Sequence, residues 1–328
     1  MNRSEIVFLY DISYANPNGD PMDENKPRID EETEINIVTD VRLKRTIRDY
    51  LHDFKNKDIF VREIEYEPGK IQDAKLRAED YLIDESGNKL NKKDFKLDEM
   101  KESMYNNIIK RCIDVRLFGG TIPIEKTSSQ KSSITLTGPV QFKFGRSLNK
   151  VEIKHIKGTG AFASSAGKQQ KTFREEYVLP YSLINFYGVV NENAAKKTKM
   201  TDDDVSLLIE AIWNGTKNLI TRSKFGQMPR VLIKITYKEE NYFIGDLDKK
   251  IKIEHDFDDD KQLRDIQEMN LDISDLVNIL KSNNDKIESI SLKVDPLARF
   301  KVGSTEIKGE KLIDALSDME LPTSELKL

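Results

Sequence analysis

The first patterned segment of the chain lies close to its start and is almost wholly apolar. Every second position from Ile6 to Ile12 is apolar, which predicts a buried strand over residues 5–12. The same two-residue period predicts strands over residues 133–145 and 230–237. Further strands are predicted over residues 59–66, 151–156, 177–190 and 287–294.

In other segments apolar residues recur three and four positions apart, which is the period of a helix. One such helix follows Thr39 and Asp40, which suit its N-terminal cap, and another follows Thr201 for the same reason. Three more helices are predicted over residues 98–118, 274–282 and 309–317.

The order of elements up to residue 245 is strand, helix, strand, insertion, strands, helix and strand. Without the insertion this is the βαββαβ order of ferredoxin-like and RNA-recognition-motif folds, so we predict an α+β fold of that kind. Its core is discontinuous, over residues 1–67 and 108–245. A hydrophilic, mostly helical insertion occupies residues 68–107, and a small acidic part occupies residues 246–328.

Composition narrows the class of protein. Charged residues make up 34% of the 328 residues, above the usual share of about 25%. No run of 18 apolar residues is present, so we expect no membrane-spanning helix, and the N-terminal residues lack the apolar core of a signal peptide. Cys112 is the only cysteine, which excludes a disulfide framework and a cysteine-based zinc site. We expect a cytoplasmic protein.

The charges are segregated along the chain. Residues 126–174 hold ten Lys or Arg and one acid, whereas residues 246–328 hold 13 basic and 20 acidic residues. A solvated charged face explains such a pattern as well as a polyanion partner does. The basic stretch is also rich in Gly, Ser and Thr, which allow a backbone to approach phosphate closely. This favours the polyanion.

Motifs of enzymes and metal sites are incomplete. Residues 256–267 resemble a calcium loop, but Lys261 and Gln267 replace the Gly and the Glu that such a loop needs. Gly167-Lys168 lacks the remaining residues of a phosphate-binding loop. Residues 158–163 fit a dinucleotide fingerprint, but no amphipathic helix follows them. We therefore expect no catalytic residue, no metal and no cofactor.

Basic side chains occur in three groups that a ferredoxin-like core can bring together. The first helix carries four, the central stretch carries ten, and Arg222 and Lys224 precede the last core strand. Phe162 and Phe173 lie in the central stretch, where they either stack on bases or pack in the loop. Together these features predict a groove that follows a nucleic-acid backbone.

Several strings of residues resemble the seventh CRISPR-associated (Cas) protein family. The opening of that family is matched by residues 16–21 (Asn-Pro-Asn-Gly-Asp-Pro), 27–30 (Pro-Arg-Ile-Asp) and 38–48 (Val-Thr-Asp-Val-Arg-Leu-Lys-Arg-Thr-Ile-Arg). Its subtype I-B branch is matched by residues 114–119, 138–142, 145–149, 213–216 and 222–226. The resemblance extends over residues 5–245.

The resemblance implies an RNA-recognition-motif palm, a finger at residues 68–107 and a thumb at residues 155–174. It implies a non-enzymatic backbone subunit of type I Cascade complexes that serve antiviral defence. The expected partners are the CRISPR guide RNA, further copies of the chain, other Cascade subunits and target DNA paired with the guide.

The resemblance also implies which side chains contact the guide backbone. The matched positions are Asn16, Asn18, Arg28, Thr39, Arg42, Lys44, Arg45 and Arg48, to which Lys143 and Arg146 are added. The thumb contributes His155, Lys157, Phe162 and Lys168, and the third basic group contributes Arg222 and Lys224.

Three other classes of protein remain open at this point. A ferredoxin-like CRISPR RNA endonuclease needs a base such as His155 or metal-holding acids such as Asp11, Asp20, Asp23 and Asp30, which otherwise shape turns. A nucleotide-binding enzyme would use residues 158–160. A structural module would bind no nucleic acid.

Overall fold

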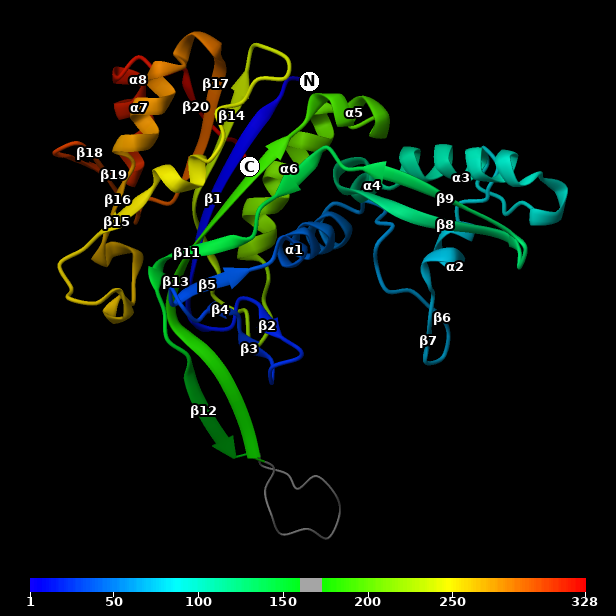
Figure 1. Cartoon of the computed structure of the whole chain (residues 1–328), viewed down its shortest axis with the longest axis horizontal. Helices are drawn as coiled ribbons and strands as arrows, with labels where there is room; N and C mark the ends of the chain where they lie inside the picture. Colours follow the sequence, from blue (N-terminus) through cyan, green and yellow to red (C-terminus); the bar gives the residue numbers. More distant parts are fainter. Residues whose placement is uncertain (160–172) are drawn as a thin grey trace. The chain divides into compact units, whose positions relative to one another are not determined.

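The computed structural model describes residues 1–159 and 173–328 (Figure 1). Within it the chain forms two compact units, each assembled from separate segments. Unit A comprises residues 1–3, 45–141 and 189–215, and unit B comprises residues 4–44, 142–188 and 216–328. Two helices, α1 (Asp40–Asp53) and α6 (Asp202–Lys217), belong partly to each unit.

Unit B is organised around one large sheet (Figure 1). Its strands lie in the order β20 (Thr323–Glu325), β17 (Ile287–Val294), β14 (Met228–Tyr237), β1 (Ser4–Ala15), β13 (Phe173–Val190), β11 (Gly145–Lys150), β5 (Ile35–Val38) and β4 (Ile29–Asp30). In the antiparallel register Val7 is paired with Ile233, and Ile233 with Leu292. The sheet therefore joins strands from both ends of the chain.

Both predicted helix starts are confirmed by their caps. At α1 the hydroxyl oxygen of Thr39 accepts a hydrogen bond from the backbone N–H of Arg42 at 3.3 Å. At α6 Thr201 and Asp204 cap each other, because each side chain accepts from the other's backbone N–H at 3.2 and 3.1 Å. The short polar side chains thus satisfy N–H groups that have no partner within the helix.

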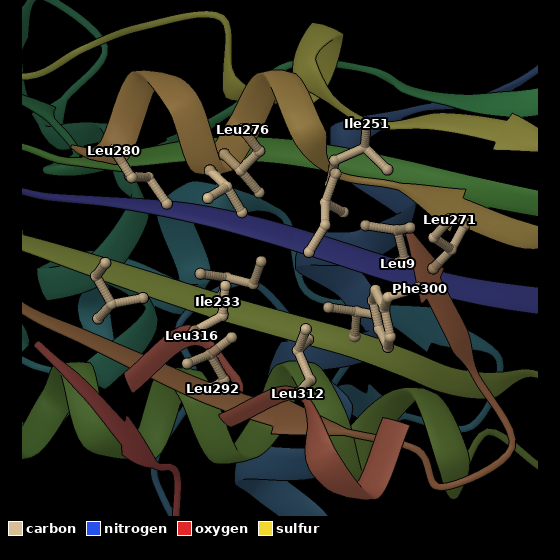
Figure 2. Close-up of a pocket in the computed structure, with 14 residues that line it drawn as sticks. Leu9, Ile233, Ile251, Leu271, Leu276, Leu280, Leu292, Phe300, Leu312 and Leu316 are labelled. Atoms are coloured by element: carbon tan, nitrogen blue, oxygen red, sulfur yellow. The ribbon is translucent and has the colours of Figure 1, made fainter. Parts of the chain in front are cut away.

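The C-terminal segment packs on the large sheet. It contains α7 (Ser274–Ser282), α8 (Leu312–Asp318) and a small sheet of β15 (Lys252–Glu254), β16 (Asn270–Asp272), β18 (Arg299–Val302) and β19 (Thr305–Lys308). Figure 2 shows Leu9 and Ile233 of the large sheet pointing into one apolar space with Leu276 and Leu312 of the two helices. The space left there is about 10 Å³, at the lower limit of what one water needs, so this part of the core is closely packed.

Glu5 joins three parts of unit B around a buried carboxylate. Its side chain accepts hydrogen bonds from the hydroxyls of Tyr187 and Tyr237. It also accepts from the backbone N–H groups of Ile244 and Gly245 at 2.9 and 2.8 Å. These four donors replace the water that a buried carboxylate loses.

Unit A has its own core beneath a hairpin. Its elements are α2 (Ala74–Glu79), α3 (Leu97–Arg111), α4 (Ile113–Phe118), β8 (Gly119–Thr127), β9 (Gln130–Thr137) and α5 (Glu192–Thr198). Met100, Met104 and Ile108 recur at helical spacing on α3 and lie in one buried cluster with Ile122 and Ile134 of the hairpin.

The remaining elements are short. The strands are β2 (Gly19–Asp20), β3 (Lys26–Pro27), β6 (Glu65–Glu67), β7 (Lys70–Ile71), β10 (Val140–Phe142) and β12 (Lys154–Thr159). The 3-10 helices are Lys92–Asp94, Leu247–Lys250, Asp260–Gln262, Ile266–Glu268, Asn284–Lys286 and Gly309–Lys311. Among the described residues, no helix is long and apolar enough to cross a lipid bilayer.

Two predicted elements differ clearly from the structure, and other elements were not predicted at all. The strand predicted over residues 59–66 is wrong apart from its end in β6, because the Phe60 and Val61 N–H groups donate to the Asp114 carboxylate rather than to a strand. The helix predicted over residues 98–118 breaks at Cys112, whose backbone is extended (φ −92°, ψ 102°). The elements that were not predicted include helix α5 and strands β5, β8, β15, β16, β18 and β19.

Candidate nucleic-acid interface

Two loops of unit B are tied together at Asn16. The backbone N–H of Asn16 donates to the carbonyl of Ser223 at 2.8 Å, and the ammonium of Lys224 donates to the carbonyl of Asn16 at 3.2 Å. The amide of Asn16 donates to the carbonyl of Asn25 at 2.7 Å, which closes the loop after β1. The buried Asn16 therefore holds in place the loops on which several predicted contacts lie.

Asn18 and Thr39, two predicted contacts, hold the start of α1. The side-chain oxygen of Asn18 accepts hydrogen bonds from both the N–H and the hydroxyl of Thr39 at 2.9 Å. Arg28 braces the same loop by donating to the carbonyl of Gly19 at 2.7 Å, with Asp20 at 3.4 Å. These polar residues give the loop one defined conformation.

Most predicted cations of α1 have acidic partners. Lys44 pairs with Asp40 at 2.9 Å, and Arg45 pairs with Asp49 at 2.7 Å, each one helical turn apart. Arg48 pairs with Asp114 at 3.0 Å. The positive charge that α1 offers to a ligand is therefore smaller than its four basic residues alone would suggest.

Arg42 and Lys224 are brought together from distant parts of the sequence. Burial lowers the pKa of the Lys224 ammonium, and the positive charge of Arg42 lowers it further. Asn16 and Ser223 supply uncharged oxygens to Lys224, at 3.2 and 3.5 Å. An anion placed beside these two cations would relieve their repulsion.

Lys143 and Arg146 lie beside acids. Lys143 contacts Asp246 at 2.6 Å and Asp248 at 3.3 Å, and hydrogen bonds from lysines, Lys143 foremost, lower the pKa of Asp246 to about 2. Arg146 lies 3.3 Å from Asp30. Both pairs are solvent-accessible, so they exchange partners at little cost.

His155 lies in the hairpin formed by β12 and β13 (Figure 1). Its ring stacks on Tyr177 with centroids 4.6 Å apart. The Tyr177 hydroxyl donates to Glu24 at 2.8 Å, and the ammonium of Lys26 lies 5.4 Å from the Tyr177 ring. This links the base of the hairpin to the loop after β1.

Lys157 and Arg222 also contact the hairpin's acids. Lys157 lies 3.5 Å from Glu175, and Arg222 donates to Glu176 at 2.6 Å. Phe162 and Lys168 lie outside the described residues.

Three aromatic residues near these loops were not predicted as contacts. Tyr177 stacks on His155, whereas Tyr14 and Phe225 are 60% and 65% exposed. Phe225 follows Arg222 and Lys224 directly, and aromatic residues interleaved with basic ones are a recognisable signal of nucleic-acid binding.

The acids proposed for a nuclease do not meet at one point. Asp11 is buried, accepts from the Tyr181 hydroxyl at 3.0 Å and lies 3.0 Å from Arg230. Burial raises the pKa of the Asp11 carboxyl to about 6. In the described part of the chain no three His, Cys, Asp or Glu side chains are grouped to hold a metal ion.

Comparison with known proteins identifies relatives over nearly the whole chain. The model of the family described as CRISPR-associated protein Cas7 matches residues 2–274. A protein of Haloferax volcanii described as CRISPR-associated protein Cas7 is 31% identical over 335 residues, which cover 97% of this chain and 94% of that protein.

Solved structures share the fold at low sequence identity. Two chains, from structures described as a CRISPR RNA-guided surveillance complex and as the same kind of complex before nicking, match with TM-scores of 0.52 and 0.53 at 12% identity. The matches cover 97% of this chain and 100% and 99% of those chains. They agree with the mixed α+β architecture, a large sheet with helices. The family match and the identity to the Haloferax protein show that the chain belongs to the CRISPR-associated protein Cas7 family.

Proposed function

We propose that this chain is a guide-RNA-binding backbone subunit of a type I-B CRISPR surveillance complex, in which several copies polymerise along one guide RNA. The relative is described as a Cas7 protein, and the structures of similar fold are described as RNA-guided surveillance complexes. The subunit presents the guide for pairing with target DNA and cleaves neither strand.

The pair of Arg42 and Lys224 is the observation that carries this proposal. Two cations come together on loops that Asn16 holds in place, and the pKa of Lys224 is lowered by burial and by Arg42. A phosphate of the RNA backbone placed beside these two cations would offset their mutual repulsion, and such a contact is independent of base identity. A subunit that accepts any guide needs this kind of contact.

The order of the strands supports the proposed palm. β14, β1, β13 and β11 are neighbours in the sheet. When the other elements between them are set aside, these strands and the two long helices follow along the chain as β1, α1, β11, β13, α6 and β14, which is the βαββαβ order of a ferredoxin-like core. In this arrangement the segment at 68–107 serves as the finger and the segment at 155–174 as the thumb.

The proposal is tested by RNA binding of the full chain. Two labelled single-stranded RNAs of unrelated sequence are titrated at several salt concentrations against the parent chain and an Arg42→Ser/Lys224→Ser variant. We expect weaker binding of both RNAs and a salt slope reduced by about 0.7 for each lost phosphate contact. A Lys308→Ser variant is the matched control, because Lys308 is exposed on β19, away from these loops.

Other outcomes would contradict parts of the proposal. A loss of affinity for only one of the two RNAs would mean that these side chains recognise bases. Unchanged affinity for both RNAs would show that Arg42 and Lys224 do not contact the RNA. Cleavage of the RNA favours the endonuclease. Nuclease digestion of RNA bound to excess protein should leave regularly spaced fragments, and uniform digestion would contradict polymerisation.

A further inference from the structure

An open groove of about 310 Å³ lies between helix α3 and strand β9 of unit A. Figure 1 shows these two elements running beside each other. Residues 133–136, which follow one another on β9, line one side of the groove. The other side is a single stripe of α3, with the helical spacing of Asp98, Lys101, Glu102 and Tyr105. The volume is at the lower end of the range for ligand pockets, about 300–1,000 Å³, so the groove has room for part of a partner molecule.

One edge of β9 is open, because β9 pairs only with β8 among the described strands. Pro123 of β8 lies opposite Ser133 and has no N–H to donate. The N–H of Gly119, which lies opposite Thr137, donates to a carbonyl of α4 instead of to β9. Both pairs are therefore of the non-hydrogen-bonded kind, which occurs at every second position of an antiparallel hairpin. The backbone N–H and C=O groups of Ser133 and Thr135 consequently point away from β8, toward the open edge.

This edge lacks the protection that edge strands usually have. Charged residues, prolines or a covering element normally keep such an edge from pairing with another strand. On β8, Pro123 and the adjacent α2 supply that protection. Residues 132–137 of β9 (Ser-Ser-Ile-Thr-Leu-Thr) contain neither a charge nor a proline. In the described part of the chain the backbone groups of Ser133 and Thr135 have no hydrogen bond to another element, so they offer donors and acceptors to an incoming strand.

Side chains of an added strand would reach α3. Ile134 points from β9 toward α3, since it lies in one buried cluster with Met100 and Met104. An added strand continues the pleat of the sheet, so every second side chain lies on this same face. Tyr105 and Leu136, both half-buried, offer these side chains an apolar floor.

The α3 side of the groove carries charges that the fold does not use. Asp98 and Glu102 are exposed, and neither forms an ion pair with another described residue. Lys101 is half-buried on the same stripe, so two carboxylates face one ammonium there. Asp98 and Glu102 are four residues apart, which is about 6 Å along a helix axis. Alternate residues of a strand are about 6.6–6.8 Å apart, so two basic side chains at alternate positions reach both carboxylates.

We propose that the open edge of β9 binds an extended segment of a partner protein as an added strand, with lysine or arginine at two alternate positions facing Asp98 and Glu102. In strand addition the backbone hydrogen bonds give affinity and the alternate side chains give specificity. The proposal does not rest on the guide contact, because Arg42 and Lys224 belong to unit B.

The test titrates the full chain against labelled peptides and follows their fluorescence anisotropy. One probe is a nine-residue threonine peptide with lysine at its fourth and sixth positions, and the other has glutamate at both. We expect the parent chain to bind the lysine peptide about tenfold more tightly than the glutamate peptide. An Asp98→Lys/Glu102→Lys variant should reverse this preference. A Glu63→Lys/Glu85→Lys variant is the matched control and should keep it, since both acids are exposed in unit A and neither lines the groove.

Two further measurements distinguish strand addition from attraction between charges alone. The N–H groups of successive residues point to opposite sides of a strand. Methylation of the two lysine backbone nitrogens and methylation of the two nitrogens that follow them should therefore differ, with only one of the two abolishing binding. A Thr135→Pro variant removes an N–H from the open edge and should weaken binding of the lysine peptide about tenfold, with a melting temperature within a few degrees of the parent chain.

The proposal is overturned if neither peptide binds, if the two methylated peptides bind alike, or if the Asp98→Lys/Glu102→Lys variant still prefers lysine. Sedimentation of the chain without RNA tests a second copy as the occupant. Association of the parent chain that Thr135→Pro abolishes would assign the edge to contact between copies and would overturn a partner protein.

Discussion

The guanidinium Nε of Arg48 lies 3.0 Å from Oδ2 of Asp114, whose side chain is fully buried. Asp114 also accepts hydrogen bonds from the backbone N–H groups of Phe60 and Val61 at 2.8 and 3.1 Å. The pair thereby joins α1 to the segment that leads into residues 68–107 and to α4. Arg48 also stacks on Phe118, with 5.1 Å between its guanidinium carbon and the ring centroid.

We predict that Arg48→Ala destabilises the protein strongly. The substitution leaves the buried Asp114 charge without its cation, and breaking such a pair costs about 3–5 kcal/mol. Urea unfolding measures the free energy of unfolding. Arg45→Ala is the control, because the exposed Arg45–Asp49 pair contributes about 1 kcal/mol or less. Equal losses in the two variants would show that the Arg48–Asp114 pair has no special role.

Local patterns predict local structure in this chain well. The predicted bounds of α7 and β17 match the structure, because an apolar stripe marks α7 and alternating apolar residues mark the end of β17. The break at Cys112 has no such mark, since the apolar stripe continues through it in sequence. An extended backbone there depends on contacts with residues far away along the chain.

The partners of charged side chains could not be predicted from the sequence either, because they also depend on contacts between residues far apart along the chain. A count of basic residues cannot tell that Arg48 pairs with Asp114, 66 positions away, or that Arg116 pairs with Asp204, 88 positions away. The meeting of Arg42 with Lys224 is also set by the tertiary fold. The sequence indicates which kinds of side chain are present, and the fold decides which charges remain available for a ligand.

Asp11 predicts a specific pH dependence of stability. Burial raises the pKa of its carboxyl to about 6 in the folded protein, above the ordinary 3.8, although Arg230 and Tyr181 oppose the shift. The folded state therefore holds this proton more tightly than the unfolded state does. The contribution of Asp11 to the free energy of unfolding falls as pH rises from about 4 to about 6, by about 2–3 kcal/mol at 1.36 kcal/mol per unit.

The Asp11→Asn variant should lose this dependence. Urea unfolding of both proteins between pH 4 and pH 7 measures it as a change in their stability difference. Asp23→Asn is the control, because Asp23 is exposed in the loop after β1. Parallel curves for the parent chain and Asp11→Asn would contradict the prediction.

The acidic loop at residues 256–260 contains one carboxylate that the fold uses and others that are exposed. Asp260 is used within the chain, since it contacts His255 at 2.9 Å and accepts from the backbone N–H of Lys150 at 3.0 Å. Asp256 and Asp258 are exposed and have no side-chain partner among the described residues. They therefore remain available to the basic stretch at residues 126–174 of another copy.

We predict that Asp256→Lys/Asp258→Lys weakens assembly on RNA and leaves the melting temperature of the monomer within a few degrees. Asp260→Asn should instead lower the melting temperature, because it removes an acceptor that the chain itself uses. Sedimentation of the protein with RNA measures assembly, and thermal unfolding measures the monomer. Unchanged sedimentation of the double variant would remove this loop from the contact between copies.

Lys224 predicts that RNA affinity depends on pH on the alkaline side. Burial and the charge of Arg42 lower the pKa of the free ammonium below the ordinary 10.5, and a bound phosphate raises it again. RNA affinity is therefore highest at pH values below the pKa of Lys224 in the free protein. It weakens as pH rises through the pKa of Lys224 in the complex. Each unit by which RNA raises this pKa weakens binding about tenfold at high pH.

The Lys224→Arg variant should bind RNA with little dependence on pH between 7 and 9.5, because a guanidinium stays charged there. The Lys308→Arg variant is the control and should follow the parent chain. If the affinities of the parent chain and Lys224→Arg decline in parallel, Lys224 does not contact the phosphate.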